Sequence, residues 1–315
     1  MKALLLGATG FLGKRLALRL ERDGVDYIPV SRSGGTDLRD PAQFERVLSR
    51  NPDVDVVLNA AAFIGGIKFG IEHPAEIYYN NSLMSTYLYE LAYRYDIRRV
   101  VNPIANCSYP RDIRPEFKEE LWWDGPLDDS VLVYGDVRRS SYVQSLAYNQ
   151  QYGLETLNLI VPNMYGPGDH FDEERSHALG ALVMKIARAH REHLPEVIVW
   201  GTGKPVREWL FVDDCVEAML RATEVPYRQE PINIGVGEGV SIADLAKMIC
   251  EEVGYRGSIT FDTSRPDGAP HKVMNVTRCV EVFGWRPLTS LPEGLARTVQ
   301  WYLDHPADRA GTGAQ

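Results

Sequence analysis

Long apolar stretches, an excess of basic residues and closely paired cysteines are all missing from this sequence, and each absence excludes a class of protein. No apolar run approaches the roughly 18 residues of a membrane span, and no signal peptide precedes the first predicted strand. The formal net charge is −9, and an acidic surface argues against nucleic acid or an anionic membrane as the main partner. We therefore expect a soluble globular protein that binds neither nucleic acid nor membranes.

Only four cysteines occur in the 315 residues, and their spacing shows neither a CxxC pair nor a metal-binding pattern. The sequence therefore predicts no metal site, and a reducing cytoplasm is the simplest location. A cysteine taken alone is most often a buried structural thiol, so a functional role for any of them needs a further argument. The four are Cys107, Cys215, Cys250 and Cys279.

The most informative feature present is the glycine-rich segment from Gly7 to Gly13, which directly follows the apolar run at residues 1–6. A short buried strand, a glycine turn and an amphipathic helix over 14–22 form the first unit of a dinucleotide-binding fold. Gly7 permits the tight turn, Gly10 lets the backbone approach a pyrophosphate, and Gly13 lets the helix pack closely on the strand. Free N–H groups at the helix start then favour the phosphates. The predicted cofactor-binding residues here are Gly7, Thr9, Gly10, Phe11, Leu12 and Gly13.

Short apolar strands alternate with helices through the first half of the chain, which is typical of a parallel sheet with helices on both faces. We expect strands at 27–30, 54–58, 99–103 and 157–161, and helices at 41–50, 74–95 and 140–152. Further on, we expect helices over 177–190, 213–223 and 242–253, and strands over 197–200, 209–212 and 232–235. The predicted fold class is α/β, a Rossmann-type doubly wound parallel sheet with a smaller C-terminal α/β lobe that binds substrate.

The regular alternation ends near Tyr165, where Gly166-Pro167-Gly168 breaks the chain. We therefore predict a dinucleotide-binding domain over 1–165, to which residues 208–235 return. The substrate-binding lobe is expected over 166–207 and 236–306, followed by a frayed tail at 307–315.

Residues that directly follow the strands are candidates for ligand binding, because ligands of open α/β sheets bind beyond the carboxyl ends of the strands. After the second strand comes Arg32 and no carboxylate, which favours a 2′-phosphate and hence NADP, with NAD as the alternative. Asp37 and Leu38 are candidates to flank the adenine. Three small residues follow the next strand and allow either close approach of a cofactor or tight packing: Ala60, Ala61 and Ala62.

Several motifs of the chain occur together in one known family. The glycine turn, Asn59-Ala60-Ala61-Ala62, a tyrosine with a basic residue four positions later, and Tyr165-Gly166-Pro167 resemble the extended short-chain dehydrogenase/reductases. These are nucleotide-sugar epimerases, dehydratases and reductases. Within the family the chain resembles the GDP-L-fucose synthase group, which combines 3,5-epimerase and 4-reductase activity on a GDP-linked 4-keto-6-deoxy sugar. The matching stretches are AAAFIGGI (60–67), CSYP (107–110), YNQQYG (148–153), MYGPGDHF (164–171), Ser176-His177, VWGTG (199–203), PVREWLFVDD (205–214), INIGVG (232–237) and RPDGAPHK (265–272).

The resemblance implies a reduction in which a tyrosine gives a proton to the ketone oxygen while NADPH gives hydride to the carbon. Tyr134 matches that tyrosine, and a nearby cation would stabilise its phenolate. The usual lysine is Arg138 here, and the usual serine is Ala105. Arginine stays charged but cannot relay protons as lysine can, and it is a candidate to hold the cofactor ribose. Asn106, next to Ala105, is a candidate to donate an amide hydrogen bond in place of the serine hydroxyl.

The resemblance also implies an epimerisation, in which a thiol and an imidazole act on opposite faces of the sugar. Deprotonation beside the ketone gives an enolate, and reprotonation from the other face inverts the centre. An acid and a base with pKa values near neutrality suit this task. Both family positions are kept, as Cys107 and His177, so the chain favours proton-transfer chemistry more than reduction.

For the substrate, the resemblance implies contacts to a GDP-linked sugar from the second half of the chain. Arg207 and Lys185 match positions near the nucleotide phosphates and sugar, and Lys272 is a further cation for the diphosphate. Trp200 is a candidate to pack on the base or sugar, and Asn163 to contact substrate; surface solvation or core packing is the competing interpretation. In the family, helices equivalent to 74–95 and 140–152 pair across a homodimer, which we expect here.

Three functions stay open at this point. The first is an NADP-dependent epimerase/reductase of a GDP-linked 4-keto-6-deoxy-hexose. The second is a redox-neutral epimerase or dehydratase with a tightly bound NAD(P), favoured by Ala105 and Arg138. The third is a nucleotide-sugar-binding homologue without catalytic activity.

Overall fold

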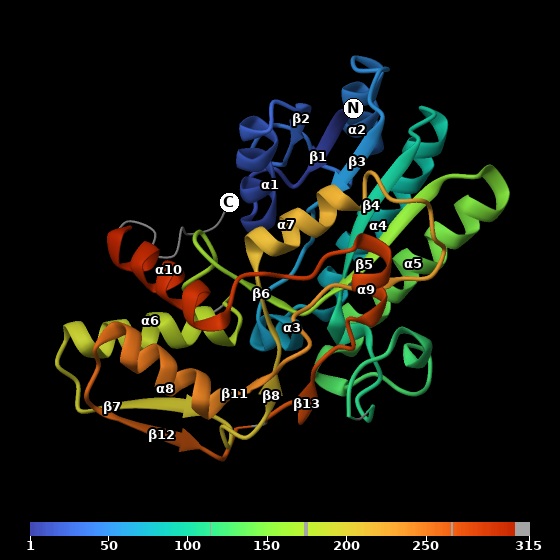
Figure 1. The fold of residues 1–315 in the computed structure, drawn as a ribbon. Helices are drawn as coiled ribbons and strands as arrows, with labels where there is room; N and C mark the ends of the chain where they lie inside the picture. Colours follow the sequence, from blue (N-terminus) through green and yellow to red (C-terminus); the bar gives the residue numbers. More distant parts are fainter. Residues whose placement is uncertain (114, 173–175, 266, 306–315) are drawn as a thin grey trace.

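A six-stranded parallel sheet forms the centre of the chain (Figure 1). The computed structural model describes residues 1–113, 115–172, 176–265 and 267–305. The strand order across the sheet is β10-β5-β4-β3-β1-β2. The strands are β1 (Lys2–Leu6), β2 (Asp26–Val30), β3 (Val56–Asn59), β4 (Arg99–Ala105), β5 (Glu155–Val161) and β10 (Ile232–Asn233). The α/β fold class predicted from the sequence is confirmed.

Helices cover both faces of this sheet. On one face, α1 (Phe11–Arg22) and α7 (Val212–Arg221) pack over a core that holds Leu5, Leu58 and Leu159. On the other face, α2 (Pro41–Ser49), α4 (Pro74–Arg94) and α5 (Leu132–Tyr152) enclose Leu4, Val57 and Val100. The strands are buried on both sides because apolar residues occupy both alternating sets of positions. Within the described ranges, no helix combines the length and apolar character needed to cross a membrane.

A smaller lobe lies at one end of the sheet and has its own core between three helices (Figure 1). Its helices are α6 (Ala178–Arg191), α8 (Ile242–Val253) and α10 (Leu291–Asp304). Its strands form three small sheets. They are the pair β6 (Asn163–Tyr165) and β9 (Trp209–Phe211), the pair β7 (Glu196–Trp200) and β12 (Ser258–Asp262), and the triplet β11 (Val240–Ser241), β8 (Val206–Arg207) and β13 (His271–Lys272).

A ladder of buried amide side chains crosses the middle of the large sheet. Asn59 donates to Asn102 on the neighbouring strand (3.0 Å), and Asn102 donates to Asn158 on the next (3.0 Å). Asn158 in turn donates to the hydroxyl of Ser145 on α5 (3.0 Å). At the other end, the Asn59 carbonyl oxygen accepts the backbone N–H of Ala61 (3.2 Å). The ladder therefore connects α5 with the loop that follows β3.

Several predicted boundaries were wrong. Helix α5 begins at Leu132 and not at 140, because Asp128 caps a short 3-10 turn that leads directly into it. Gly135 interrupts the helical pattern there, but a Cβ at this position would lie 2.8 Å from the Cys107 carbonyl oxygen. Helix α1 begins at Phe11 rather than 14, and β3 begins at Val56 rather than 54.

Some elements were not predicted at all, among them α3 (Ile67–Glu72), β12, α9 (Thr277–Phe283) and α10. Helix α9 also corrects part of the domain prediction. The sequence placed 236–306 in the smaller lobe, yet Cys279 and Phe283 of α9 lie in the core of the large sheet. The predicted tail at 307–315 lies outside the described residues. The other domain boundaries stay predictions.

Candidate functional site

The glycine turn brings backbone atoms so close together that side chains have no room. Gly7 has φ +77°, and a Cβ on it would lie 2.6 Å from the Ala60 carbonyl oxygen. A Cβ on Gly13 would lie 2.0 Å from the Gly7 carbonyl oxygen, so α1 packs directly on the turn. Gly10 has only that same oxygen within 4 Å of its Cβ position, at 3.3 Å, which leaves its other side open. The turn therefore presents bare backbone outward.

The start of α1 suits an anion. Gly10 is the N-cap and brings no side chain to the first-turn N–H groups, and the first turn carries no acidic residue. Unpaired N–H groups and the positive end of the helix dipole are the features that hold phosphate in dinucleotide sites. The tight turn predicted at Gly7 and the close packing predicted at Gly13 are present. Cofactor binding by Gly10, Thr9 and Phe11 stays a prediction, and the Leu12 side chain is buried in the core, so only its backbone could take part.

The loop after β2 lies beside this turn. The Thr9 hydroxyl is 2.9 Å from the Ser33 hydroxyl, which brings exposed Arg32 next to the glycine turn. Asp37 is engaged by Arg39, whose guanidinium donates to both carboxylate oxygens and holds the Asp37 pKa below its usual value. The Leu38 side chain is buried in the core and is not available to flank the adenine, whereas Asp37 and Arg39 are partly exposed.

The loop after β4 carries the predicted proton-transfer residues. Cys107 lies in a short 3-10 turn, Asn106–Ser108, that begins where β4 ends. Arg138 reaches back from α5 and donates to the carbonyl of Pro103. Its guanidinium carbon also lies 5.8 Å from the centre of the Tyr134 ring. The structure therefore brings Cys107, Tyr134 and Arg138 together.

Burial and charge act against each other at these groups. Burial raises the pKa of the Cys107 thiol, while Lys272 and Arg138 lower it. Burial likewise raises the pKa of Tyr134, and Arg138 opposes that shift. Lys272, which the sequence assigned to the diphosphate, thus lies within electrostatic reach of the thiol.

Two buried donors at this place have no acceptor among the described residues. They are the side-chain amide Nδ2 of Asn106 and the Nε of Arg138. Both residues are almost fully buried, with 4% and 7% of their surface exposed. A buried polar group without a partner costs about 1–3 kcal/mol, so such donors commonly mark a place where a ligand or water completes the bonding.

His177 lies in the smaller lobe, as the N-cap of α6. Burial lowers its pKa below the usual 6.5, and His170 lowers it further. The charges that shift the Cys107 pKa do not include His177. Among the described residues, no electrostatic interaction links His177 with Cys107, and the two lie on different elements, so their pairing in one site stays a prediction.

Two cations lie side by side in the small three-stranded sheet. Lys272 of β13 is the parallel register partner of Arg207 of β8. Burial lowers the pKa of both side chains, while the Asp128 carboxylate acts on both in the opposite direction. The Arg207 guanidinium donates to the backbone carbonyls of Val206 (2.9 Å) and Asp267 (3.4 Å). Two of the three cations predicted near the phosphates, Arg207 and Lys272, therefore share one face of this sheet, while Lys185 lies on α6.

Trp200, at the end of β7, lies close to two cations. The residue is 54% exposed, and the Lys185 ammonium lies 5.6 Å and the Arg265 guanidinium 4.9 Å from the centre of its ring. Asp267 accepts from the backbone and hydroxyl of Thr202 beside it (2.6 and 2.7 Å). Core packing of Trp200, the competing interpretation, is wrong. Asn163 opens β6 and pairs in register with Trp209.

Sequence reasoning missed several residues that interact with the predicted site residues or lie beside them: Arg39, Asp128, Thr202, Arg265 and Asp267. Arg265 and Asp267 lie inside the RPDGAPHK stretch that was noted for its resemblance, so that motif held the signal. Asp128 and Arg39 lie in loops without a pattern and gave none.

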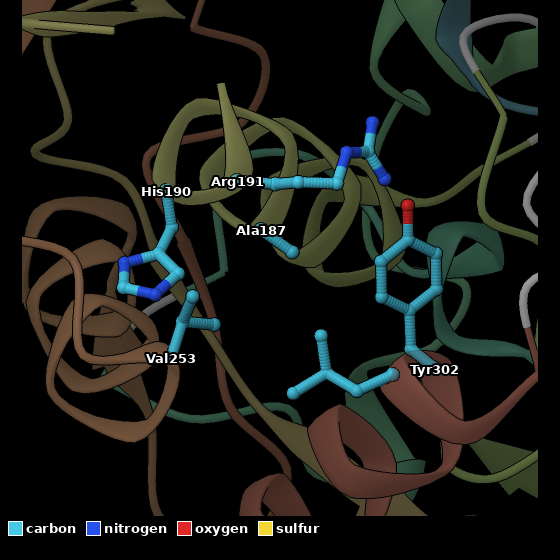
Figure 2. A pocket seen from close by; sticks show the side chains of 6 residues that line it. Ala187, His190, Arg191, Val253 and Tyr302 are labelled. Atoms are coloured by element: carbon cyan, nitrogen blue, oxygen red, sulfur yellow. The ribbon is translucent and has the colours of Figure 1, made fainter. Parts of the chain in front are cut away.

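A separate pocket of about 340 Å³ lies between α6, α8 and α10 (Figure 2). His190 points into it from one side, and Arg191 and Tyr302 from the other. None of the predicted site residues lines it.

All four cysteines are unpaired. Within the described ranges, no group of three His, Cys, Asp or Glu residues could hold a metal ion.

Comparison with known proteins gives consistent results. The sequence profile of the NAD dependent epimerase/dehydratase family matches residues 3–235. A GDP-L-fucose synthase of Sinorhizobium fredii is 33% identical over 302 residues, which cover 96% of this chain and 95% of that protein. The GDP-L-fucose synthase of Escherichia coli is 31% identical over 314 residues, covering 96% and 97%. A GDP-6-OMe-4-keto-L-xylo-heptose reductase from C. jejuni shares the fold with a TM-score of 0.90 at 22% identity, over 96% of this chain and 98% of that one.

Proposed function

Because the chain belongs to the NAD dependent epimerase/dehydratase family, we propose that it is an NADP-dependent epimerase/reductase of a GDP-linked 4-keto-6-deoxy-hexose. The observation that carries the proposal is the proximity of Cys107, in the turn after β4, to Tyr134 and Arg138 on α5, within electrostatic reach of Lys272. A thiol, a phenol and two cations at one place suit proton transfer beside a ketone on an anionic substrate. The names of the relatives supply the substrate class.

The cofactor fits the glycine turn. The N–H groups at the start of α1 would hold its pyrophosphate, and Arg32 would pair with the 2′-phosphate. Arg138, fixed by its bond to the Pro103 carbonyl, would hold ribose hydroxyls. When bound, NADPH supplies the hydride for the ketone carbon.

The two proton-transfer residues have complementary forms at neutral pH. The Cys107 thiol keeps its proton because burial raises its pKa above the usual 9.0. The His177 imidazole stays neutral and able to accept because burial lowers its pKa below 6.5. We assign the imidazole as the base that removes a proton beside the ketone, and the thiol as the acid that returns one from the opposite face.

The two buried donors without a partner are candidates to bind the ketone oxygen of the substrate. Negative charge grows on that oxygen when a neighbouring carbon loses its proton. Asn106 Nδ2 and Arg138 Nε would donate to it, in place of the serine that Ala105 replaces. Donors fixed in advance stabilise such charge without reorganisation.

The diphosphate and the nucleotide of the substrate would bind in the smaller lobe. Arg207 and Lys272, adjacent on one sheet, would hold the diphosphate, and charge-assisted hydrogen bonds to phosphate are the strong kind. Lys185, Trp200 and Asn163 would contact the nucleotide and sugar.

The test is incubation of the purified protein with GDP-4-keto-6-deoxymannose and NADPH in deuterated water. We expect deuterium at the carbons beside the ketone, and oxidation of NADPH. Absence of both deuterium uptake and NADPH oxidation would contradict the proposal for this substrate.

A redox-neutral epimerase or dehydratase is the second candidate, favoured by Ala105 and by Arg138, whose charge is permanent. In that case deuterium enters while added NADPH is not consumed. A homologue that binds GDP-sugars without turnover would show binding and neither change.

We also propose a homodimer through α4 and α5. Both helices expose large apolar side chains, and scattered ones would need no explanation, but these share two adjacent helices. They are Tyr78, Tyr79, Tyr93, Leu132, Val143 and Tyr152. Light scattering after size-exclusion chromatography tests this, and a monomer at micromolar concentration would contradict it.

A further inference from the structure

Glu208 is a fully buried carboxylate that the proposed chemistry does not use. It lies between β8 and β9 with 0% of its surface exposed. Its oxygens accept three backbone N–H groups, from Val236 (2.6 Å), Gly237 (2.9 Å) and Met274 (2.8 Å). Burial raises its pKa to about 7, while these three bonds oppose the shift. The carboxylate therefore links its own segment to two others through backbone hydrogen bonds.

The three N–H groups belong to two segments that Glu208 joins to its own. Val236 and Gly237 follow β10, the edge strand of the large sheet. Met274 comes two residues after Lys272 of β13, and Glu208 itself directly follows Arg207 of β8. The Glu208 backbone N–H also donates to the Lys272 carbonyl (3.2 Å). Figure 1 draws β8 and β13 side by side between the large sheet and the rest of the smaller lobe.

A second buried side chain connects the segments that Glu208 joins to the loop after β4, which carries Cys107 and is here called the cysteine loop. Asn233 of β10 accepts from the Tyr109 hydroxyl (2.9 Å), and Tyr109 is two residues beyond Cys107. The amide of Asn233 donates to the carbonyls of Phe117 (2.8 Å) and Asn275 (3.0 Å). The cysteine loop and the two cations are therefore tied to the same short segment, 233–237.

We infer that Glu208 is a positioning residue, which fixes Arg207 and Lys272 relative to Cys107 so that a diphosphate held by the cations brings the sugar to the thiol. The inference rests on the proposed function, since it takes the pair as the diphosphate site. Glu208 acts through its neighbours and needs no contact with substrate. Its loss would let β8 and β13 shift while the cofactor turn, on the opposite side of the sheet order, stays in place.

The experiment is Glu208→Gln, with GDP and NADPH affinities measured by isothermal titration calorimetry. Glutamine keeps the size but replaces one acceptor oxygen by an NH₂ that faces a backbone donor. We expect the Kd for GDP to rise about tenfold and the Kd for NADPH to stay within about twofold. The KM for the sugar nucleotide would rise with the Kd for GDP.

Asp214→Asn is the matched control. Asp214 is also buried and accepts two backbone N–H groups, from Leu288 (3.3 Å) and Thr289 (3.1 Å), but neither segment carries a predicted ligand of the diphosphate. Its variant should lose stability without a change in GDP affinity. Unchanged GDP affinity in E208Q, or a parallel loss of GDP and NADPH affinity, would overturn the inference.

Gly235→Ala disturbs the same contact with the charge retained, because its Cβ would lie 2.1 Å from Glu208 Oε1. It should weaken GDP binding as E208Q does, and it decides the matter if E208Q does not fold. Normal GDP affinity in a folded G235A variant would count against the inference. Failure of the unmodified protein to bind GDP would instead contradict the proposed function.

Discussion

The two walls of the site are built from different material. The part that would bind the cofactor, which we call the backbone wall, consists of glycines with no room for a side chain and of N–H groups at a helix start. The part that would transfer protons, which we call the side-chain wall, consists of Cys107, Tyr134 and Arg138, with Lys272 from far along the sequence. The first wall should fail when atoms are added, and the second when atoms are removed.

Gly13→Ala is the sharpest test of the backbone wall, and we expect the largest effect from it. Its Cβ would meet the Gly7 oxygen at 2.0 Å, so α1 must move off the turn. Because overpacking is costly, the Kd for NADPH should rise more than about 100-fold. Gly24→Ala is the control, since its Cβ meets nothing within 4 Å. It should lower stability by about 1 kcal/mol through its positive φ and leave NADPH binding intact. Equal effects of both variants on NADPH binding would show that packing at the turn does not matter.

Cys107→Ser tests the side-chain wall by removing one functional atom. Deuterium uptake beside the ketone should fall about 100-fold or more, with NADPH affinity unchanged, because a hydroxyl is a far weaker acid than a thiol. His177→Asn should have a similar effect. If deuterium uptake occurs and survives both changes, the assigned roles are wrong.

The pH dependence of deuterium uptake separates these two groups. Uptake should fall toward acid pH through a pKa below 6.5, because protonated His177 cannot accept a proton. It should fall toward alkaline pH through a pKa above 9.0, where Cys107 has lost its proton. The alkaline fall should vanish in the residual activity of Cys107→Ser. An alkaline limb that persists in that variant belongs to another group.

Ala105→Ser adds an atom to the side-chain wall and should help rather than harm. A hydroxyl at the end of β4 would give the ketone oxygen another donor, so NADPH oxidation should rise about tenfold. Deuterium uptake, which the cysteine and histidine govern, should change little. An unchanged rate of oxidation would indicate that Asn106 already supplies the missing hydrogen bond.

The smallest effect is expected from Arg32→Ala, at the exposed rim of the backbone wall. An exposed charge pair contributes little, so the preference for NADPH over NADH should fall by about fivefold. Arg22→Ala, another exposed arginine at the far end of α1, is the control. A preference for NADPH that is unchanged in R32A would assign the 2′-phosphate to a different residue.

The same contrast explains what could be predicted from the sequence. The glycine turn depends on residues within one short segment, so its spacing alone predicted the strand, the turn and the helix. The sheet followed from alternating apolar runs for the same reason. Cys107, Tyr134 and Arg138 needed the family resemblance, because nothing in their local pattern differs from that of core residues.

The parts that were missed depend on contacts between distant segments. Helix α5 begins at Leu132 because the 3-10 turn at 129–131 leads into it, and the glycine that hides this in the sequence serves a contact with Cys107. Asp128 joins the site only through its electrostatic interaction with Arg207 and Lys272, which lie far along the sequence. The same holds for Lys272, whose proximity to the thiol required the register of β13 on β8.

The amide ladder through Asn59, Asn102 and Asn158 has a consequence for how the sheet assembles. Side chains alternate between faces along a strand, so a slip of one residue in the pairing of β4 would turn Asn102 toward the opposite core. The partners on both sides would then lose their hydrogen bonds, at a cost of about 1–3 kcal/mol for each buried group left unpaired. Leucines at these three positions would pack in more than one strand register, whereas the three amides keep their hydrogen bonds in only one. The ladder thus selects a single alignment of the central strands during folding, and all the loops that carry the site inherit that alignment.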